Sequence, residues 1–206
     1  MQENRDLGFI HRFVPAEAEG KTPLLLLHGT GGSEDDLLPL GQQLSPGSAL
    51  LSPRGKVLEN GMPRFFRRHG EGVFDIDDLR ARTEELAKFL EAARAHYGIG
   101  KPIALGFSNG ANIAWSLMLA RPDALAGAIL LRGMLPFDPP EKPALNGMPV
   151  LIVNGNMDPI VPSEVHRKLA DTLRGLGADL RYEVLSASHQ LTRQDLAIAA
   201  GWLNAR

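Results

Sequence analysis

The stretch KPIALGFSNGANIAWSLMLA, residues 101–120, joins an apolar run typical of a buried strand to a segment typical of a helix. Between them lies GFSNG, in which Gly106 and Gly110 each stand two residues from Ser108. A serine flanked in this way occupies a sharp, strained turn that lifts its hydroxyl clear of the sheet. Both glycines are needed because a side chain at either position would collide with the neighbouring strand or helix. The stretch therefore predicts a nucleophilic Ser108 at one edge of a sheet.

The rest of the chain alternates short apolar runs with longer segments of helical period. This pattern is typical of an α/β fold, with helices on both faces of a mainly parallel sheet. The expected seven strands cover residues 9–14, 24–27, 49–51, 103–105, 128–131, 150–153 and 180–184. The first is expected to be an antiparallel edge strand. The expected helices cover residues 34–44, 75–97, 109–120, 163–176 and 195–203. Because no linker or internal repeat is found, residues 1–206 are expected to form a single domain.

The composition limits the possible partners. A formal net charge of -2 gives no reason to expect nucleic acid or an acidic membrane surface as a partner. The chain has no cysteine, which excludes disulfides, thiolate metal ligands and a cysteine nucleophile. The N-terminal MQENRDLGFI lacks the features of a secretory signal, and no apolar run approaches the ~20 residues of a membrane helix. We therefore expect a cytoplasmic protein without a membrane span.

A serine hydroxyl needs a base, and the base needs a group that orients it. His189, in SASHQL, follows the last predicted strand, and Asp158, in VNGNMDPIVP, follows the strand before it. Taken alone, His189 could be a solvated loop histidine and Asp158 part of an Asp-Pro turn. However, Ser108, Asp158 and His189 occur in the chain order of α/β-hydrolases, which differs from the two common serine-protease orders. The sequence therefore predicts a Ser-Asp-His triad.

A glycine-rich turn, LLLLHGTGGSEDD (residues 24–36), follows a predicted buried strand, as a loop that binds a developing oxyanion should. It lacks the Gly-Lys-Ser/Thr ending of a phosphate loop, and Glu34 stands where a dinucleotide fingerprint requires glycine or alanine. The backbone N–H groups of Thr30 and Asn109 are the expected oxyanion donors. His28 is expected to support this loop. No paired histidine spacing is found, so neither a metal nor a cofactor is expected.

The segment NGMPRFFRRHGEGVFD, residues 60–75, clusters basic and aromatic side chains. One interpretation is a loop that Phe65 and Phe66 anchor to the core. The other is a wall of the substrate cleft, in which the phenylalanines offer aromatic surface and Arg64 a positive charge. The sequence alone leaves both interpretations open.

Several of these stretches resemble, in order and spacing, the phospholipase/carboxylesterase and acyl-protein thioesterase group of small α/β-hydrolases. They are LLLLHGTGG, GMPRFF, LGFSNGANIAWSLML, GAILLRGMLP, VNGNMDPIVP and ASHQLTRQD. SPRGKVLENGMPRFFRR is similar to a bacterial branch, the MhqD-like hydrolases associated with quinone stress. The resemblance implies the same triad and oxyanion donors, and a cleft lined by Met62, Arg64, Phe65 and Phe66. Asn109 departs from the glutamine usual in the thioesterases, so substrate preference does not carry over.

These observations predict an α/β-hydrolase without a lid domain that cleaves a small-molecule carboxylic ester through an acyl-enzyme on Ser108. Acyl thioesters and polyesters remain alternative substrates. A non-catalytic protein that binds a small molecule on the same scaffold is the alternative of another class. A homodimer also stays open.

Overall fold

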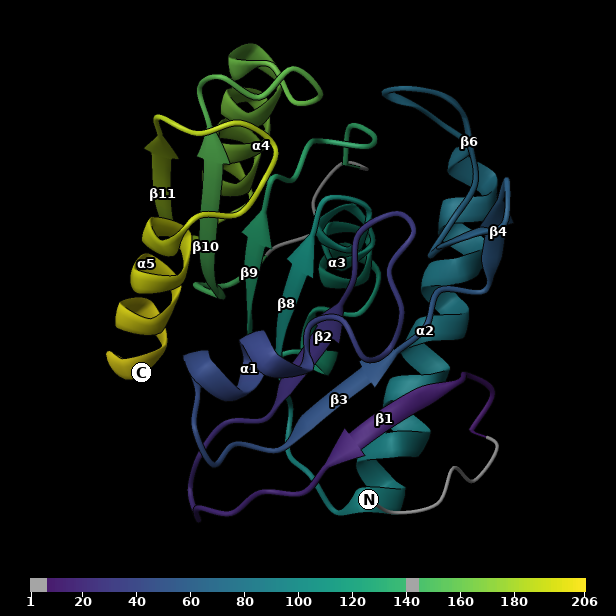
Figure 1. The fold of residues 1–206 in the computed structure, drawn as a ribbon, viewed down its shortest axis with the longest axis vertical. Coiled ribbons are helices and arrows are strands. Elements are labelled where there is room, and N and C mark those ends of the chain that lie inside the picture. Colours follow the sequence, from purple (N-terminus) through teal and green to yellow (C-terminus); the bar gives the residue numbers. More distant parts are fainter. Residues whose placement is uncertain (1–6, 140–144) are drawn as a thin grey trace.

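The structure, a computed structural model, describes residues 7–139 and 145–206. Its centre is a seven-stranded sheet of order β1-β3-β2-β8-β9-β10-β11 (Figure 1). The β1–β3 pair is antiparallel and every other pair is parallel. The seven predicted strands and the antiparallel edge are thus confirmed. The strands are β1 (His11–Val14), β2 (Leu24–Leu27), β3 (Leu50–Pro53), β8 (Ile103–Phe107), β9 (Gly127–Leu131), β10 (Pro149–Gly155) and β11 (Asp179–Leu185).

Helices cover both faces of the sheet and enclose two cores. The helices α1 (Leu38–Leu44) and α5 (Arg193–Asn204) pack on one face. The other face is covered by α2 (Ile76–Tyr97), α3 (Asn109–Ala120) and α4 (Ser163–Gly175). A short 3-10 helix, η1 (Pro122–Ala124), follows α3. Because β2 lies between these layers, all four of its leucine side chains are completely buried.

The helix predicted from residue 34 begins four residues later, at Leu38. Proline is tolerated only in the first turn of a helix, so Pro39 fixes where this helix can start. Glu34 meanwhile lies outside the helix and is buried in an ion pair with Arg54. The residues between β2 and α1 therefore form an extended loop.

The sequence did not predict two small hairpins, which lie beside α2 at the right of Figure 1. The first pairs β4 (Val57–Glu59) with β5 (Met62–Arg64), and the second pairs β6 (Arg68–Gly70) with β7 (Val73–Phe74). Asn60 and Gly61 turn the first hairpin with φ values of 50° and 80°. Asn-Gly with positive φ at both positions is the preferred two-residue hairpin turn. This dipeptide was the available sequence signal for the hairpin.

The parallel strands bring distant parts of the chain to one edge of the sheet. The carboxyl ends of β2, β8, β10 and β11 point the same way, so the loops that follow them gather at that edge (Figure 1). These loops contain Thr30, Ser108, Asp158 and His189. Within residues 7–139 and 145–206, no helix combines the length and hydropathy that crossing a membrane requires.

Candidate active site

Ser108 lies in a strained turn between β8 and α3. Its backbone angles, φ 52° and ψ -112°, fall in a region that residues with side chains rarely occupy. The Ser108 N–H donates to the Leu131 carbonyl at 2.9 Å, and the Ser108 carbonyl accepts from the Asn112 N–H at 3.1 Å. The surrounding backbone therefore holds the serine in this conformation, at the tip of the turn.

The two flanking glycines permit this turn for steric reasons. A Cβ atom on Gly106 would lie 2.5 Å from the carbonyl oxygen of Gly110, in the first turn of α3. A Cβ atom on Gly110 would overlap the carbonyl oxygen of Leu27, at the end of β2. The collisions predicted from the sequence are confirmed. Only glycine lets α3 start this close to the two strands.

Ser108, His189 and Asp158 form one chain of hydrogen bonds. The Nε2 atom of His189 lies 3.0 Å from the Oγ of Ser108, and its Nδ1 lies 2.8 Å from the Oδ2 of Asp158. The second carboxylate oxygen accepts from the N–H groups of Ile160 and Val161, at 2.8 and 3.0 Å. Since a carboxylate only accepts, Nδ1 carries the imidazole proton and Nε2 is free to accept the serine proton. In this arrangement His189 is placed where it can take a proton from Ser108.

Burial differs along this chain of hydrogen bonds. The Asp158 side chain is completely buried, whereas 16% of the His189 side chain is exposed. The Phe107 ring packs against the His189 ring, with 5.4 Å between the centroids. The carboxylate is thus isolated from solvent, while the imidazole can reach a molecule bound at the surface.

Two backbone N–H groups, one in the loop after β2 and one directly after Ser108, are candidates to bind a ligand oxygen. In the described part of the chain, the N–H groups of Thr30 and Asn109 have no hydrogen-bond partner. Asn109 is the first residue of α3, where the helix dipole favours negative charge. Thr30 is exposed in the glycine-rich loop after β2. The two predicted oxyanion donors are therefore both available.

His28 connects the start of this loop to the chain after β3. Its Nδ1 donates to the Gly29 carbonyl at 2.6 Å, and its Nε2 accepts from the Gly55 N–H at 2.9 Å. A backbone N–H can only donate, so this pair of bonds requires the neutral imidazole. Burial also lowers the pKa of His28 below its ordinary value. The predicted supporting role of His28 agrees with these contacts.

Other histidines make structural contacts. His11 lies 2.8 Å from the Tyr97 hydroxyl, and the Nδ1 of His166 lies 2.6 Å from the Tyr182 hydroxyl. Among the described residues, no three His, Asp or Glu side chains are grouped as a metal ion would require.

The residues predicted to line the cleft differ in their exposure. Met62 is 42% exposed and packs against Gly31 of the loop after β2. Phe65 and Phe66 are 2% and 0% exposed and belong to the core beneath this segment. They offer no aromatic surface to a cleft, so their burial supports the alternative interpretation, in which they anchor the segment. Arg64 is also buried and donates to the Thr30 hydroxyl at 2.7 Å.

The sequence analysis missed a buried arginine that holds the His189 loop. Arg132 follows β9, and its guanidinium donates to both carboxylate oxygens of Asp195, at 2.6 and 2.9 Å. The same guanidinium donates to the carbonyls of Ser188 and Gln190, at 2.9 and 3.0 Å. Arg132 therefore fixes the two residues that flank His189. A lone arginine directly after the apolar run AILL was the available signal.

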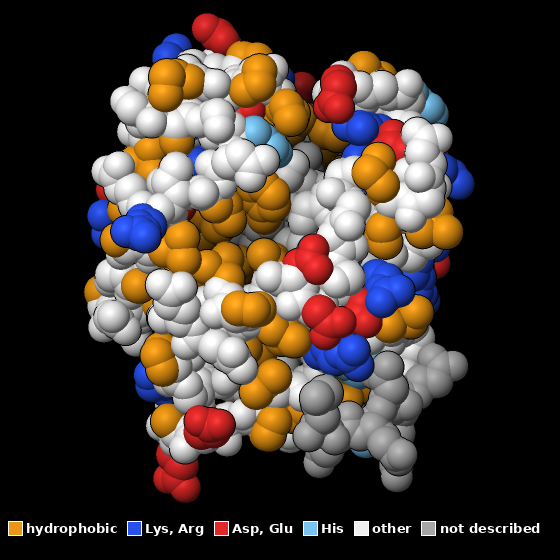
Figure 2. Space-filling view, in the orientation of Figure 1, with side chains coloured by type: hydrophobic (Ala, Val, Ile, Leu, Met, Phe, Trp, Pro, Cys, Tyr) orange, Lys and Arg blue, Asp and Glu red, His pale blue; other side chains and the backbone are white. Residues whose placement is uncertain are grey.

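Two hollows adjoin the triad loops. A cleft of about 410 Å³ is lined by Leu37, Phe107, Leu191 and the loop from Gly29 to Gly32. A second pocket of about 460 Å³, mostly apolar, has Met134 and Ile160 in its lining. In Figure 2, hydrophobic side chains gather in a hollow beside the segments occupied by α1 and α5. The surface near Ser108 can thus accommodate apolar groups.

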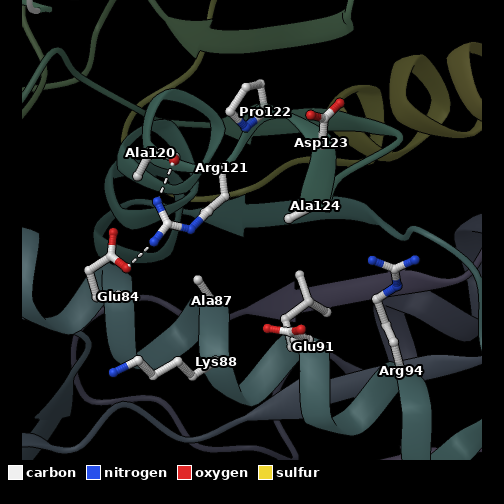
Figure 3. A pocket seen from close by; sticks show the side chains of 11 residues that line it. Glu84, Ala87, Lys88, Glu91, Arg94, Ala120, Arg121, Pro122, Asp123 and Ala124 are labelled. Atoms are coloured by element: carbon white, nitrogen blue, oxygen red, sulfur yellow. Dashed lines mark hydrogen bonds and ion pairs between the residues drawn. The ribbon is translucent and has the colours of Figure 1, made fainter.

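A larger groove, of about 600 Å³, lies between α2 and the C-terminal end of α3 (Figure 3). Charged side chains line much of it, and Arg121 donates to Glu84 across it at 2.6 Å. Ser108 is at the opposite end of α3, about 18 Å away for a helix of 12 residues. Although this groove is larger than the two hollows, its distance from Ser108 excludes it from the candidate site.

Comparison with known proteins identifies the family of this chain. Residues 11–206 match the family described as Phospholipase/Carboxylesterase. The Bacillus subtilis (strain 168) protein named "Putative hydrolase MhqD" is 49% identical over 181 residues, which are 87% of this chain and 90% of that protein. The crystal structure of the Bacillus cereus carboxylesterase matches with a TM-score of 0.94 and 42% identity, covering 97% of this chain and 95% of that one.

A second carboxylesterase structure, from Mesorhizobium loti, matches with a TM-score of 0.92 and 32% identity, covering 98% of this chain and 97% of that one. The fold predicted from the sequence is therefore confirmed by structures that the chain matches over nearly its whole length. By sequence and by structure, this chain belongs to the phospholipase/carboxylesterase family of α/β-hydrolases.

Proposed function

We propose that this protein is a carboxylesterase-type serine hydrolase that forms an acyl-enzyme on Ser108. The observation that carries the proposal is the hydrogen-bond chain from Ser108 through His189 to Asp158, together with the N–H groups of Thr30 and Asn109, which have no partner among the described residues. Membership of a family of hydrolases and esterases supports the same reaction class.

In the first half of the reaction, Ser108 Oγ attacks the ester carbonyl while His189 Nε2 takes its proton. The N–H groups of Thr30 and Asn109 stabilise the negative charge that develops on the carbonyl oxygen. His189 then returns the proton to the alcohol oxygen, and the carbon–oxygen bond to the alcohol breaks. Asp158 holds the imidazole in the required tautomer and stabilises its protonated form. The product of this half is an ester between the acyl group and Ser108.

In the second half, a water molecule replaces the alcohol. His189 takes one proton of the water as its oxygen attacks the acyl-enzyme, and returns it to Ser108 Oγ as that bond breaks. The same two N–H groups bind the second oxyanion. The free acid leaves and the serine is regenerated. Both halves use one set of residues, so loss of Ser108 removes the acyl-enzyme route and loss of His189 strongly slows both halves.

The surroundings favour a small ester with apolar parts. The cleft beside Thr30 and the pocket beside Ile160 give apolar surface on two sides of the triad loops. Met62 extends this surface above the loop at Gly31. Thioesters and polyesters stay alternatives, because the triad chemistry is common to them. Values of kcat/KM for matched oxygen and sulfur esters separate the first of these, and release of soluble products from a polyester film tests the second.

The decisive experiment is intact-mass analysis after treatment with a fluorophosphonate. We expect one adduct on the wild type, none on Ser108→Ala and strongly slowed labelling of His189→Ala. Ser186→Ala is the matched control, because this exposed serine lies in the loop after β11 and outside the triad. Absence of an adduct on folded wild type would contradict the proposal and favour a binding protein on a hydrolase scaffold.

A further inference from the structure

We propose that Arg64 is a positioning residue for the oxyanion hole, acting through the side chain of Thr30. The inference rests on the proposed function, since it concerns the N–H group of Thr30 that would bind the oxyanion. Arg64 itself need not touch the substrate: its guanidinium holds the loop that carries the donor.

Three consecutive residues at the end of β5, Pro63, Arg64 and Phe65, each form a hydrogen bond with the loop after β2 or with Asn109. The Pro63 carbonyl accepts from the Gly31 N–H at 2.9 Å. Arg64 Nη1 donates to the Thr30 hydroxyl at 2.7 Å, and the Phe65 N–H donates to the Asn109 side-chain oxygen at 2.8 Å. One short segment therefore contacts both residues whose N–H groups are the proposed oxyanion donors.

Arg64 is suited to this role because its own position is fixed. Only 2% of its side chain is exposed, and it also donates to the Phe66 carbonyl and to Glu59, both at 3.2 Å. A Cβ atom on Gly55 would overlap the Arg64 carbonyl, so the chain after β3 packs directly on its backbone. Because several contacts fix the Arg64 guanidinium, it also restricts the position of the hydroxyl to which it donates.

The loop after β2 needs such external support. Gly29, Gly31 and Gly32 give it a high conformational freedom, and Gly31 adopts a φ of 82°. His28 fixes the start of the loop through Gly55, but Thr30 itself is exposed. Among the described residues, Arg64 is the one hydrogen-bond partner of the Thr30 hydroxyl. Without it, the direction of the Thr30 N–H is less well defined, and an oxyanion donor acts only if it is already aligned.

The test measures kcat and KM for a neutral aryl ester. Arg64→Met is expected to lower kcat by about 10- to 100-fold and to change KM by no more than about threefold, because a misaligned donor affects mainly the transition state. Arg68→Met is the matched control. Arg68 also donates to Glu59, at 2.9 Å, but makes no contact with the oxyanion loop in the described residues. We expect its kcat within about twofold of the wild type.

Substitutions of Thr30 test the same contact from the other side. Thr30→Val keeps the backbone N–H but removes the hydroxyl, and we expect a loss of kcat similar to that of Arg64→Met. Thr30→Ser keeps a hydroxyl, so its kcat should decrease less than that of Thr30→Val. If Arg64 acts through this hydroxyl, the double variant Arg64→Met/Thr30→Val should be no slower than the slower single variant. Should Arg64→Met fail to fold, the comparison of Thr30→Val with Thr30→Ser decides the question.

The outcomes separate this inference from the proposed function. A folded Arg64→Met with wild-type kcat, or a double variant whose losses multiply, would overturn the positioning role of Arg64. The reaction of Ser108 would still stand if the fluorophosphonate adduct forms on the wild type. Absence of esterase activity and of an adduct in the wild type would instead reject the proposed function, and this inference with it.

Discussion

Replacing Arg132 by methionine should both destabilise the fold and disturb the His189 loop. The substitution removes a guanidinium whose side chain is completely buried and leaves the buried carboxylate of Asp195 without its arginine partner. It also leaves the carbonyls of Ser188 and Gln190 without the donors that they have in the wild type. The Asp195 carboxylate loses two hydrogen bonds and, because it is buried, gains no contact with water in exchange.

The expected cost follows from that burial. Removing one partner of a buried ion pair typically costs about 3–5 kcal/mol. Asp195 keeps the hydrogen bonds from the N–H and hydroxyl of Thr192, at 2.7 and 2.8 Å, which favours the lower half of this range. For a protein of this size, about 1 kcal/mol corresponds to a Tm change of about 2–4 °C, so a Tm decrease of about 6–16 °C is expected.

The assay is urea unfolding followed by tryptophan fluorescence, because Trp202 is buried in α5, the helix that contains Asp195. Arg174→Met is the control. Its ion pair with Asp171, 2.9 Å long, is exposed on α4, and its loss should cost less than about 1 kcal/mol. If Arg132→Met unfolds within about 1 kcal/mol of the wild type, the inferred role of this ion pair is refuted.

A double variant separates stability from positioning. In Arg132→Met/Asp195→Asn the uncompensated buried charge is gone, so part of the unfolding free energy should return. The residues beside His189 remain without their donors, so kcat should not recover with it. Recovery of both quantities would mean that Arg132 affects activity only through stability.

Three further predictions concern single sites. Gly110→Ala should prevent folding to the native state, because the alanine Cβ would overlap the carbonyl oxygen of Leu27 at the end of β2. Gly175→Ala is the control, since its Cβ would have no atom within 4 Å, and it should melt like the wild type when followed by circular dichroism. Burial lowers the pKa of His28, so the unfolded state binds more protons than the folded state, and the free energy of unfolding should decrease as the pH falls below about 6.5. The decrease should be smaller in His28→Gln, and equal slopes of unfolding free energy against pH in the two proteins would contradict this. Thr192→Ala removes one half of the capping box of α5 and should cost about 1 kcal/mol in urea unfolding, and no change would contradict that role.

The main sheet was predictable because its strands are short apolar runs between helical segments. The four leucines of β2 are buried on both faces, which is what an unbroken apolar run indicates. The antiparallel edge strand was predictable for the opposite reason, since its residues alternate between buried and partly exposed positions. The start of α1 was predicted four residues too early, because acidic residues such as those at positions 34–36 are also favoured in the first turn of a helix.

The geometry of the site was predictable only where residue type and chain order act together. Ser108, Asp158 and His189 each follow a strand, and parallel strands bring such positions to one edge. The roles of Arg64 and Arg132 depend on contacts between residues far apart in the chain, such as the 63 positions from Arg132 to Asp195. The local signal for Arg132, an arginine directly after the apolar run AILL, does not by itself indicate whether the side chain points into the protein or into solvent.

The pairing of Arg132 with Asp195 also has a consequence for synthesis on the ribosome. The loop with His189 is held by a contact to α5, which follows every other helix and strand in the chain. A nascent polypeptide that has emerged as far as the end of β11 would contain Ser108 and Asp158. It would lack both His189 and the helix that holds the His189 loop. Turnover would therefore begin only after α5 has docked. Two co-expressed fragments divided before α5 could serve as a split reporter, in which signal depends on their reassociation.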